Sequence, residues 1–302
     1  MIELKDLQLL TALARHQHFA KAAQECGMSQ PAFSMRIRNL EDKLGVSIVR
    51  RGNRFQGLTG EGELIVARGR SLLDDARALE QEIAAARGQV TGTLDLGVVP
   101  TATSFAARLV NRLQQAHPRI LARINVMSSA AIQQRLFEGT LDAGLTYMDS
   151  IEQNLVIRQP LYDERYVVLA PVRLVAQIAL QTGEGAGEIS WAQAAELPLS
   201  LLDQSMQNRR ILDWIFAEQG LRPEVLSESS GFMSAIIMAR EGLVATILPQ
   251  ALADALGPIE GTRVLRLEAP EQARPICMAT LDREPELTTV RALRDVVAAF
   301  EQ

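Results

Sequence analysis

The chain opens with apolar residues at helical spacing. Residues 2–17 place several of them on one face, and an alanine-rich segment at 19–26 predicts a second, shorter helix. Ser29 is a favourable N-cap and Pro31 falls in a first turn, so a third helix is predicted to begin there and to end at Gly45. Its single apolar stripe consists of Phe33, Ile37, Leu40 and Leu44.

Two short helices joined by a turn at Gly27 are typical of a helix-turn-helix. Because the apolar stripe faces inward, the opposite face of helix 30–44 points outward, and its start can reach base edges in a major groove. Gln pairs with adenine, while Pro and Met can contact a thymine methyl group. The predicted DNA contacts on this helix are Gln30, Pro31, Ser34, Met35, Arg36 and Arg38. A plain helical hairpin is the alternative explanation of this spacing.

Residues 46–63 predict a small β-hairpin after this helix. Apolar and polar residues alternate, the chain turns at Gly52, and it returns at Leu58. Its predicted DNA contacts are Arg50, Arg51 and Arg54. Arginines on such a hairpin can enter a minor groove, where negative potential is focused. The pattern therefore indicates a winged helix-turn-helix, although a solvated basic loop has the same composition.

A long helix is predicted to follow from the Thr59 N-cap to about residue 88. Its apolar residues repeat every seven positions, with others interleaved at steps of four and three, which is typical of a dimeric coiled coil. The residues predicted to form the dimer seam are Ile65, Leu72, Ala76, Leu79 and Ile83. Packing of this face against the protein's own body is the alternative, because Gly69 and two alanines weaken the seam.

Beyond residues 88–92, strands alternate with helices to the end of the chain, which predicts an α/β protein with a largely parallel sheet. Hydroxyl side chains stand where predicted strands lead into helices. These candidates are Thr101, Thr103, Ser104, Ser128 and Ser129. Hydroxyls beside free helix N–H groups suit an anion such as a carboxylate, whereas ordinary N-capping explains at least one of them without a ligand.

The charge of the chain is unevenly distributed. The formal net charge is −5, yet residues 1–70 hold 11 Lys/Arg against 7 Asp/Glu, while the remaining residues hold 20 against 29. A basic head on an acidic body indicates that the head meets a polyanion, and chance clustering is the competing explanation.

Several classes of protein are disfavoured by what the sequence lacks. Cys26 and Cys277 are far apart, so no disulfide framework is predicted and a reducing cytoplasm is expected. No signal peptide and no membrane span is predicted. The Gly-rich run at 183–188 lacks the Lys-Ser/Thr of a phosphate loop, and His16 and His18 diverge on a helix instead of forming a metal pair. No enzymatic activity, metal or cofactor is therefore predicted.

Taken together, these motifs resemble the DNA-binding segment of LysR-type transcriptional regulators. The shared pattern comprises Ala22-Ala23, Ser29 to Ser34, Ile37, Leu40-Glu41, Leu44-Gly45, and Leu58-Thr59 with Gly62. The chain departs from the family pattern at His18, Met35, Arg36 and Ile48-Val49. Since positions 35 and 36 face or flank the groove, the resemblance leaves the operator sequence open.

The resemblance implies three domains. They are a winged helix-turn-helix at 1–60, a linker and dimerisation helix at 58–88, and an effector-binding domain at 91–302. The last would resemble a periplasmic solute-binding protein, with one lobe at 91–168 and 268–302 and the other at 169–267. Family members contact effectors at positions that here hold Thr101, Ser128, Ser205 and Phe232.

The expected partners follow from this resemblance. They are double-stranded DNA, a small and possibly anionic effector, further copies of the chain in a dimer or tetramer, and RNA polymerase. The alternative is a solute-binding or catalytic α/β protein whose helical head does not bind DNA. Steep salt dependence of duplex binding would separate the two hypotheses.

Overall fold

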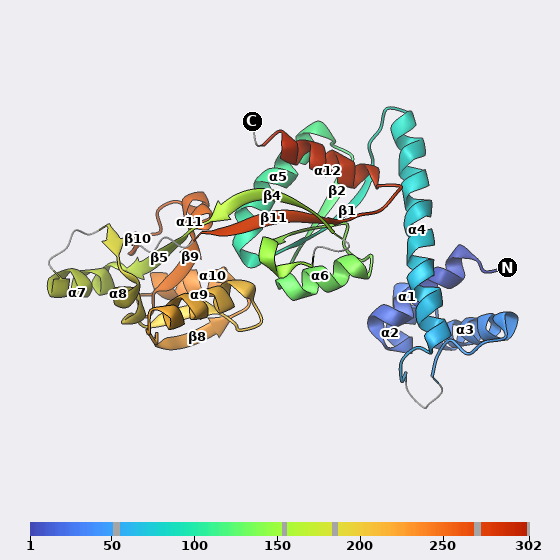
Figure 1. The fold of residues 1–302 in the computed structure, drawn as a ribbon, viewed down its shortest axis with the longest axis horizontal. Coiled ribbons are helices and arrows are strands. Elements are labelled where there is room, and N and C mark those ends of the chain that lie inside the picture. The colour runs from blue at the N-terminus through green and yellow to red at the C-terminus, as the bar shows by residue number, and fades with distance from the viewer. Residues whose placement is uncertain (51–54, 153–155, 183–186, 269–272, 301–302) are drawn as a thin grey trace. The chain divides into compact units, whose positions relative to one another are not determined.

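The computed structural model describes residues 1–50, 55–152, 156–182, 187–268 and 273–300 (Figure 1). Contacts divide the chain into two units. The first is Met1–Thr91 with Arg283–Arg291, and the second is Gly92–Asp282 with Ala292–Gln302. None of the helices among the described residues is long and apolar enough to cross a membrane.

The first unit begins with the three predicted helices. They are α1 (Leu4–His16), α2 (Phe19–Glu25) and α3 (Gln30–Leu44). Gly27 and Gly45 adopt φ of 65° and 70°, so each of the turns that follow α2 and α3 contains a left-handed residue that glycine adopts without strain. The predicted stripe on α3 is buried except for Leu44, which is partly buried. The core shared by the three helices includes Leu9, Leu10, Leu13, Phe33, Ile37 and Leu40.

The predicted hairpin is present only as a single β-bridge between Val49 and Leu58 among the described residues. Its tip, with Arg51 and Arg54, lies outside the described residues. The Glu41 Oε1 atom accepts hydrogen bonds from the backbone N–H of Ile48 at 2.7 Å and of Val49 at 3.0 Å. A carboxylate on α3 therefore holds the strand that leads into the wing.

Helix α4 (Gly60–Ala86) is the predicted long helix, and Thr59 caps it by accepting a hydrogen bond from the Gly62 N–H at 3.0 Å. A Cβ atom on Gly62 would lie 2.2 Å from the Ile48 carbonyl oxygen. A Cβ atom on Gly69 would lie 3.0 Å from a methyl group of Leu7. Both glycines therefore allow α4 to approach the head closely, one beside the wing and one beside α1.

The second unit contains two lobes. The sheet of lobe 1 has the strand order β2-β1-β3-β11-β4. Its strands are β1 (Gly92–Val98), β2 (Ile120–Val126), β3 (Ala143–Tyr147), β4 (Val156–Glu164) and β11 (Arg274–Leu281). Figure 1 shows α5 and α12 on one side of this sheet and α6 on the other. The helical elements are η1 (Pro100–Ala102), α5 (Thr103–Ala116), α6 (Ser129–Phe137), η2 (Met148–Ser150) and α12 (Thr288–Ala298).

Lobe 2 is built on a four-stranded sheet with the order β6-β10-β5-β9 and a two-stranded sheet, β7-β8. Its strands are β5 (Tyr166–Pro171), β6 (Glu188–Ile189), β7 (Leu199–Leu202), β8 (Val225–Ser229), β9 (Thr246–Pro249) and β10 (Thr262–Leu267). A bridge from Leu199 to Ala245 links the two sheets. Its helices are α7 (Val172–Thr182), α8 (Trp191–Ala195), α9 (Gln207–Glu218), α10 (Phe232–Arg240) and α11 (Gln250–Leu256).

Two details differ from the sequence-based expectation. The sheets are mixed instead of largely parallel, because β11 runs antiparallel to β3 and β4, and β5 runs antiparallel to β9 and β10. The first crossing between lobes falls at Arg165, between the end of β4 and the start of β5, and thus before the predicted boundary after residue 168. Strand β4 carries Pro160 and polar residues, which an edge strand tolerates.

Candidate functional site

The start of α3 presents the predicted recognition residues on the face opposite its buried stripe. Ser29 caps the helix by accepting a hydrogen bond from the Ala32 N–H at 3.4 Å. Gln30 and Pro31 are exposed and Ser34 is half-buried. The Met35 residue is 64% exposed, so this face combines polar and apolar side chains. The exposed face is thus free for a partner, and its DNA contacts stay a prediction.

The arginines of the head lie in different environments. Arg38 is exposed. Arg50 is also exposed, and its Nε donates a hydrogen bond to the Leu58 carbonyl oxygen at 2.9 Å, so its side chain follows the wing. Arg36, which the sequence suggests as a DNA contact, instead forms ion pairs with Glu3 at 2.9 Å and Asp6 at 2.8 Å. Its guanidinium group is therefore not free.

Helix α4 leaves part of the predicted dimer seam uncovered. Leu72, Leu79 and Ile83 are 52%, 58% and 50% exposed, and Ala76 between them is half-buried. Ile65 differs from the prediction, because it is partly buried against the core of the head. The exposed seam thus begins one heptad later than predicted, since the first turns of α4 pack on the protein's own head.

Two of the predicted effector segments meet at one edge of the lobe 1 sheet. Strands β1 and β2 are parallel, with Val98 opposite Val126, so the segments at 100–104 and 128–129 follow neighbouring strand ends. Carboxyl edges of such strands are common ligand sites in α/β proteins. The structure therefore brings together five predicted residues, Thr101, Thr103, Ser104, Ser128 and Ser129.

Most of these hydroxyls already have partners within the protein. Ser128 caps α6 through the Ala131 N–H at 3.3 Å, and Ser129 accepts a hydrogen bond from Thr146 at 2.9 Å. The Thr103 hydroxyl donates to the Pro100 carbonyl. The Ser104 Oγ atom, in contrast, is buried and has no hydrogen-bond partner. Ser104 is thus the hydroxyl of this set that makes no hydrogen bond within the described residues.

Thr101 is fully buried and belongs to a polar cluster inside lobe 1. The Tyr147 hydroxyl lies 3.2 Å from Thr101 Oγ1 and 2.6 Å from Glu164 Oε1. Burial raises the pKa of Glu164 to about 7, although the hydrogen bond from Tyr147 opposes the rise. Sequence reasoning missed this cluster, because Glu164 sits in a polar stretch before β5 that gives no signal of burial.

In lobe 2 the other predicted residues also follow neighbouring strand ends. Strands β7 and β8 are parallel with Leu202 opposite Ser229, and the Asp203 N–H donates to the Ser229 carbonyl at 2.9 Å. Ser205 follows β7, and Phe232 begins α10 after β8. Phe232 is buried in the core cluster of lobe 2, so its ring packs within the lobe.

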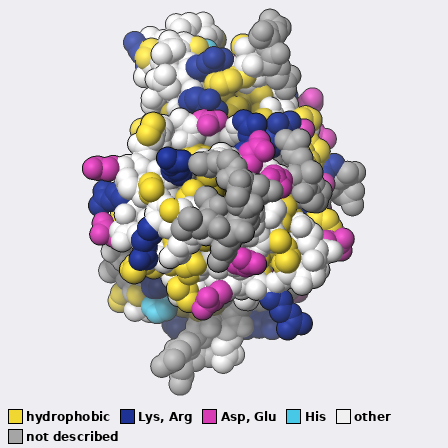
Figure 2. All heavy atoms as spheres, turned by 90° about the vertical axis from the view of Figure 1, so that its left-hand side faces the viewer, with side chains coloured by type: hydrophobic (Ala, Val, Ile, Leu, Met, Phe, Trp, Pro, Cys, Tyr) yellow, Lys and Arg dark blue, Asp and Glu magenta, His cyan; other side chains and the backbone are white. Residues whose placement is uncertain are grey.

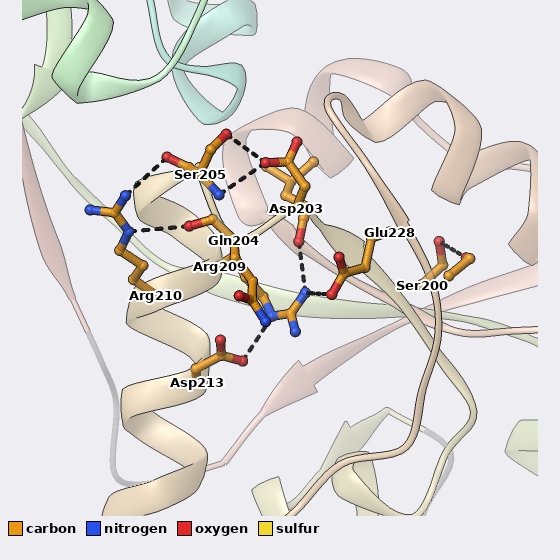
Figure 3. A network of polar contacts seen from close by, with 10 residues as sticks. Ser200, Asp203, Gln204, Ser205, Arg209, Arg210, Asp213 and Glu228 are labelled. Atoms are coloured by element: carbon orange, nitrogen blue, oxygen red, sulfur yellow. Dashed lines mark hydrogen bonds and ion pairs between the residues drawn. The ribbon is translucent and has the colours of Figure 1, made fainter.

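The loop that holds Ser205 is fixed by side chains from α9 (Figure 3). The Ser205 hydroxyl donates to Asp203 Oδ1. Arg210 donates to the carbonyl oxygens of Gln204 at 3.2 Å and Ser205 at 3.4 Å. These contacts orient the Ser205 oxygen as a hydrogen-bond acceptor, because its only proton is already donated.

Arg209 on α9 holds the same loop. It donates to the Leu202 carbonyl at 3.0 Å, to Glu228 at 2.7 Å and to Asp213 at 2.8 Å, as Figure 3 shows. The Arg209 side chain is only 7% exposed, so two carboxylates balance a nearly buried cation. The sequence offered no cue for this triad beyond the i,i+4 spacing of Arg209 and Asp213.

One face of the second unit carries charges of both signs. Figure 2 views the molecule from the side where α7 and α8 lie in Figure 1, and basic, acidic and apolar side chains are interspersed there. This face therefore differs from a one-sign surface built for a polyanion.

The two thiols lie in different units. Cys26 is partly exposed in the head, whereas Cys277 is buried in β11. Burial raises the pKa of Cys277 to about 11, so the thiol stays protonated near neutral pH.

A helix-turn-helix head joined by a long helix to a two-lobed α/β domain defines a class of ligand-responsive DNA-binding regulators. Family models agree with this architecture. The bacterial regulatory helix-turn-helix model of the lysR family matches residues 4–63, and the LysR substrate binding domain model matches residues 87–301. The chain belongs to the LysR family of bacterial transcriptional regulators, with a DNA-binding helix-turn-helix and an effector-binding domain.

Characterised relatives agree with this family. A probable hydrogen peroxide-inducible genes activator from Streptomyces viridosporus is 33% identical over 87% of this chain and 81% of its own length. A RuBisCO operon transcriptional regulator from Allochromatium vinosum is 30% identical over 72% of this chain and 70% of its own.

Solved structures show the same fold. A full-length OxyR variant from Pseudomonas aeruginosa is 26% identical, with a TM-score of 0.73 over 98% of this chain and 95% of its own. Full-length CbnR in complex with its target DNA is 19% identical, with a TM-score of 0.65 over 99% of both chains. The predicted fold class is thereby confirmed, and the reading as a regulator is supported over a solute-binding or catalytic α/β protein.

Proposed function

We propose that this regulator reads duplex DNA as a dimer through the start of α3, and that a small anionic metabolite bound by the α/β domain alters how the dimer binds DNA. The exposed Gln30, Pro31 and Met35 on a helix whose other face is buried carry the DNA-reading part of the proposal. Base edges in a major groove are the partners that suit this mixed polar and apolar tip.

Salt titration tests the DNA-binding part. Fluorescence anisotropy of a labelled duplex should show affinity that falls linearly with salt on logarithmic axes, because phosphate contacts release counterions. The duplex would be selected in vitro with the wild-type protein. Binding that is indifferent to both salt and sequence contradicts the proposal.

The effector part rests on the paired strand ends of lobe 1. Two helices of adequate length, α5 and α6, begin at this edge, and their N-termini favour negative charge. Ser104 adds a buried hydroxyl that has no partner within the protein. A carboxylate-bearing metabolite suits this combination, with Ser205 as the proposed contact from lobe 2.

A thermal-shift screen with a panel of mono- and dicarboxylates tests the effector part. A carboxylate that stabilises the wild-type protein should stabilise Ser104→Ala much less, since this variant lacks the one unused hydroxyl. Equal stabilisation of both proteins would remove Ser104 from the site.

The proposed assembly is a homodimer through the exposed seam of α4, with tetramers through the lobes. The edge strand β2 exposes Leu121, Ile124 and Val126, and lobe 2 exposes Leu226 on β8 with Met233 and Ile237 on α10. Exposed apolar residues on two separate edges suit pairing with further copies. Sedimentation of Leu121→Asp should then show dimers where the wild-type protein forms tetramers.

We also propose a cytoplasmic location and contact with RNA polymerase as parts of the regulatory role. Both rest on family membership and not on a particular residue. Co-sedimentation of polymerase with the regulator on promoter DNA would test the second.

Peroxide sensing through a pair of thiols is not proposed, although several relatives are named for peroxide induction. The chain has two cysteines, and they lie in separate units. The raised pKa of Cys277 further disfavours its oxidation, because thiolates and not thiols react.

A further inference from the structure

Arg36 links the recognition helix to the start of α1. Its Nε donates to Asp6 Oδ1 at 2.8 Å, and a terminal nitrogen donates to Glu3 Oε2 at 2.9 Å. The second Asp6 oxygen, Oδ2, accepts the Glu3 backbone N–H at 3.1 Å. Both oxygens of Asp6 and two nitrogens of Arg36 are therefore engaged within the head.

The carboxylate of Asp6 is ionised and largely hidden from solvent. The Asp6 side chain is 8% exposed. Burial alone would raise the pKa of Asp6, but hydrogen bonds from Arg36 and the Glu3 backbone outweigh it and leave the pKa below its ordinary value. Taking Arg36 away to a phosphate or a base would leave a nearly buried carboxylate without its cation, which is strongly unfavourable.

The position of Asp6 extends this link towards the dimer helix. Asp6 precedes Leu7, whose side chain packs on Gly69 of α4 in the close α1–α4 contact. Arg36 thus ties α3 to the same turn of α1 that packs on α4. In a dimer joined through α4, this turn would fix both the tilt of α3 and the distance between two recognition helices.

We propose that Arg36 is a positioning residue, which holds α3 at the angle required for DNA reading and neutralises Glu3 and Asp6, and that it does not itself contact DNA. The inference rests on the proposed function, in which α3 reads DNA. Phosphate contacts would come instead from exposed arginines such as Arg38, whose side chain forms no ion pair with another described residue.

Matched variants separate positioning from contact. Each would be titrated by anisotropy, over a range of salt concentrations, against the duplex selected with the wild-type protein. Arg38→Ala should reduce the slope of log affinity against log salt by about 0.9, the amount for one lost phosphate contact. Arg36→Ala should lower affinity about tenfold at each salt concentration, because α3 is no longer held at the angle for DNA reading, and the slope should be unchanged.

The Asp6→Asn variant supplies the second arm. If Arg36 acts through Asp6, then Asp6→Asn should also weaken binding, and the double variant should bind no worse than Arg36→Ala alone. If Arg36 contacts DNA, Asp6→Asn should leave affinity unchanged or raise it, and Arg36→Ala should reduce the slope. That second outcome overturns the inference.

Two further outcomes are decisive. Arg36→Ala and Asp6→Asn could lower the melting temperature but leave DNA affinity unchanged well below it. That result would show a merely structural role and overturn the inference. If Arg36→Ala does not fold, Arg36→Lys serves instead, because one ammonium group can pair with only part of the two carboxylates. Arg36→Lys should lose less affinity for DNA than Arg36→Ala, with the same salt slope. A wild-type protein that binds no duplex refutes the proposed function as well, whereas a reduced slope in Arg36→Ala refutes only this inference.

Discussion

The Tyr147 hydroxyl lies 2.6 Å from the Oε1 atom of Glu164, a residue only 1% exposed in the interior of the effector-binding domain. The second carboxyl oxygen, Oε2, has no hydrogen-bond partner. A carboxyl group with one unpartnered buried oxygen favours the protonated form, which agrees with its raised pKa. This contact therefore makes the stability of the domain sensitive to pH.

Folding stability should fall as pH rises from about 4.5 to about 7. The pKa of Glu164 is raised from an ordinary 4.5 to about 7, so in this range the folded state binds a proton that the unfolded state has released. The contribution is fully present below the unfolded pKa and is lost as pH passes the folded pKa. At about 1.4 kcal/mol per pKa unit, the loss is about 3 kcal/mol.

Urea unfolding of the full chain at several pH values would measure this change. Glu164→Gln is neutral throughout and should lack the loss between pH 4.5 and 7, so the stability difference between it and the wild-type protein should vary with pH. Glu218→Gln, an exposed residue on α9, is the matched control and should follow the wild-type curve. A constant difference between Glu164→Gln and the wild-type protein would contradict the raised pKa.

A methyl group at position 62 should destabilise the head. The Cβ atom of Gly62→Ala would lie 2.2 Å from the Ile48 carbonyl oxygen, so α4 and the wing strand must separate. Overpacking of this kind costs about 1–3 kcal/mol. Gly60→Ala is the control, since a Cβ atom there meets nothing within 4 Å, and it should be neutral or stabilising. Thermal unfolding of both variants measures the difference, and equal melting temperatures would count against the close approach.

Charge on the α4 seam should dissociate the dimer. Leu79→Glu combined with Leu72→Glu puts carboxylates on a face that is half exposed in the single chain and buried in the proposed dimer. Analytical ultracentrifugation should show monomers or a much weaker dimer. Leu64→Glu changes an equally exposed leucine outside the heptad positions of the seam and should leave the assembly intact. Dissociation by Leu64→Glu alone would place the interface elsewhere.

Two substitutions in the head should affect DNA binding in different ways. Gln30→Ala should change which base pairs are preferred, because the proposed function has this side chain at the start of α3 contact base edges. Arg54→Ala, in the hairpin that the sequence predicts, should weaken binding by a similar factor on every sequence. Selection from a randomised operator library measures both effects. An unchanged preference at every position in Gln30→Ala would remove this residue from the recognition surface.

Hydrogen peroxide should not produce an internal disulfide in this protein. Cys277 is buried with a raised pKa, and Cys26 belongs to the other unit. Intact-mass analysis under non-reducing conditions should show no loss of two protons after treatment with a modest excess of peroxide. Detection of a linked Cys26–Cys277 peptide after digestion would refute this expectation.

The head could be predicted nearly completely from sequence. The stripe of Phe33, Ile37 and Leu40, the Ser29 cap and the turn glycines act within a few residues of one another, so local periodicity specifies them. Gly62 belongs to a recognised motif, but the need for a glycine there comes from the close approach of the Ile48 carbonyl oxygen, which only the folded chain shows.

The effector-binding domain was less predictable. The alternation of strands and helices indicated its class, but β4 escaped notice because Pro160 and its polar neighbours do not form a strand pattern. The antiparallel pairing of β11 with β3 and β4 depends on a long-range return of the chain. Local sequence holds no information on such pairings, since the partners are more than a hundred residues apart.

Sequence alone determined the helix-turn-helix head, the long helix, the α/β body and the family, because these depend on spacing and periodicity within short segments. Tertiary structure alone decided which polar groups became paired. Arg36 lies thirty residues from Asp6, and Tyr147 lies 46 residues from Thr101 and 17 from Glu164. The energy of a charge depends on its burial and nearest opposite charge, and both are set only when distant segments meet.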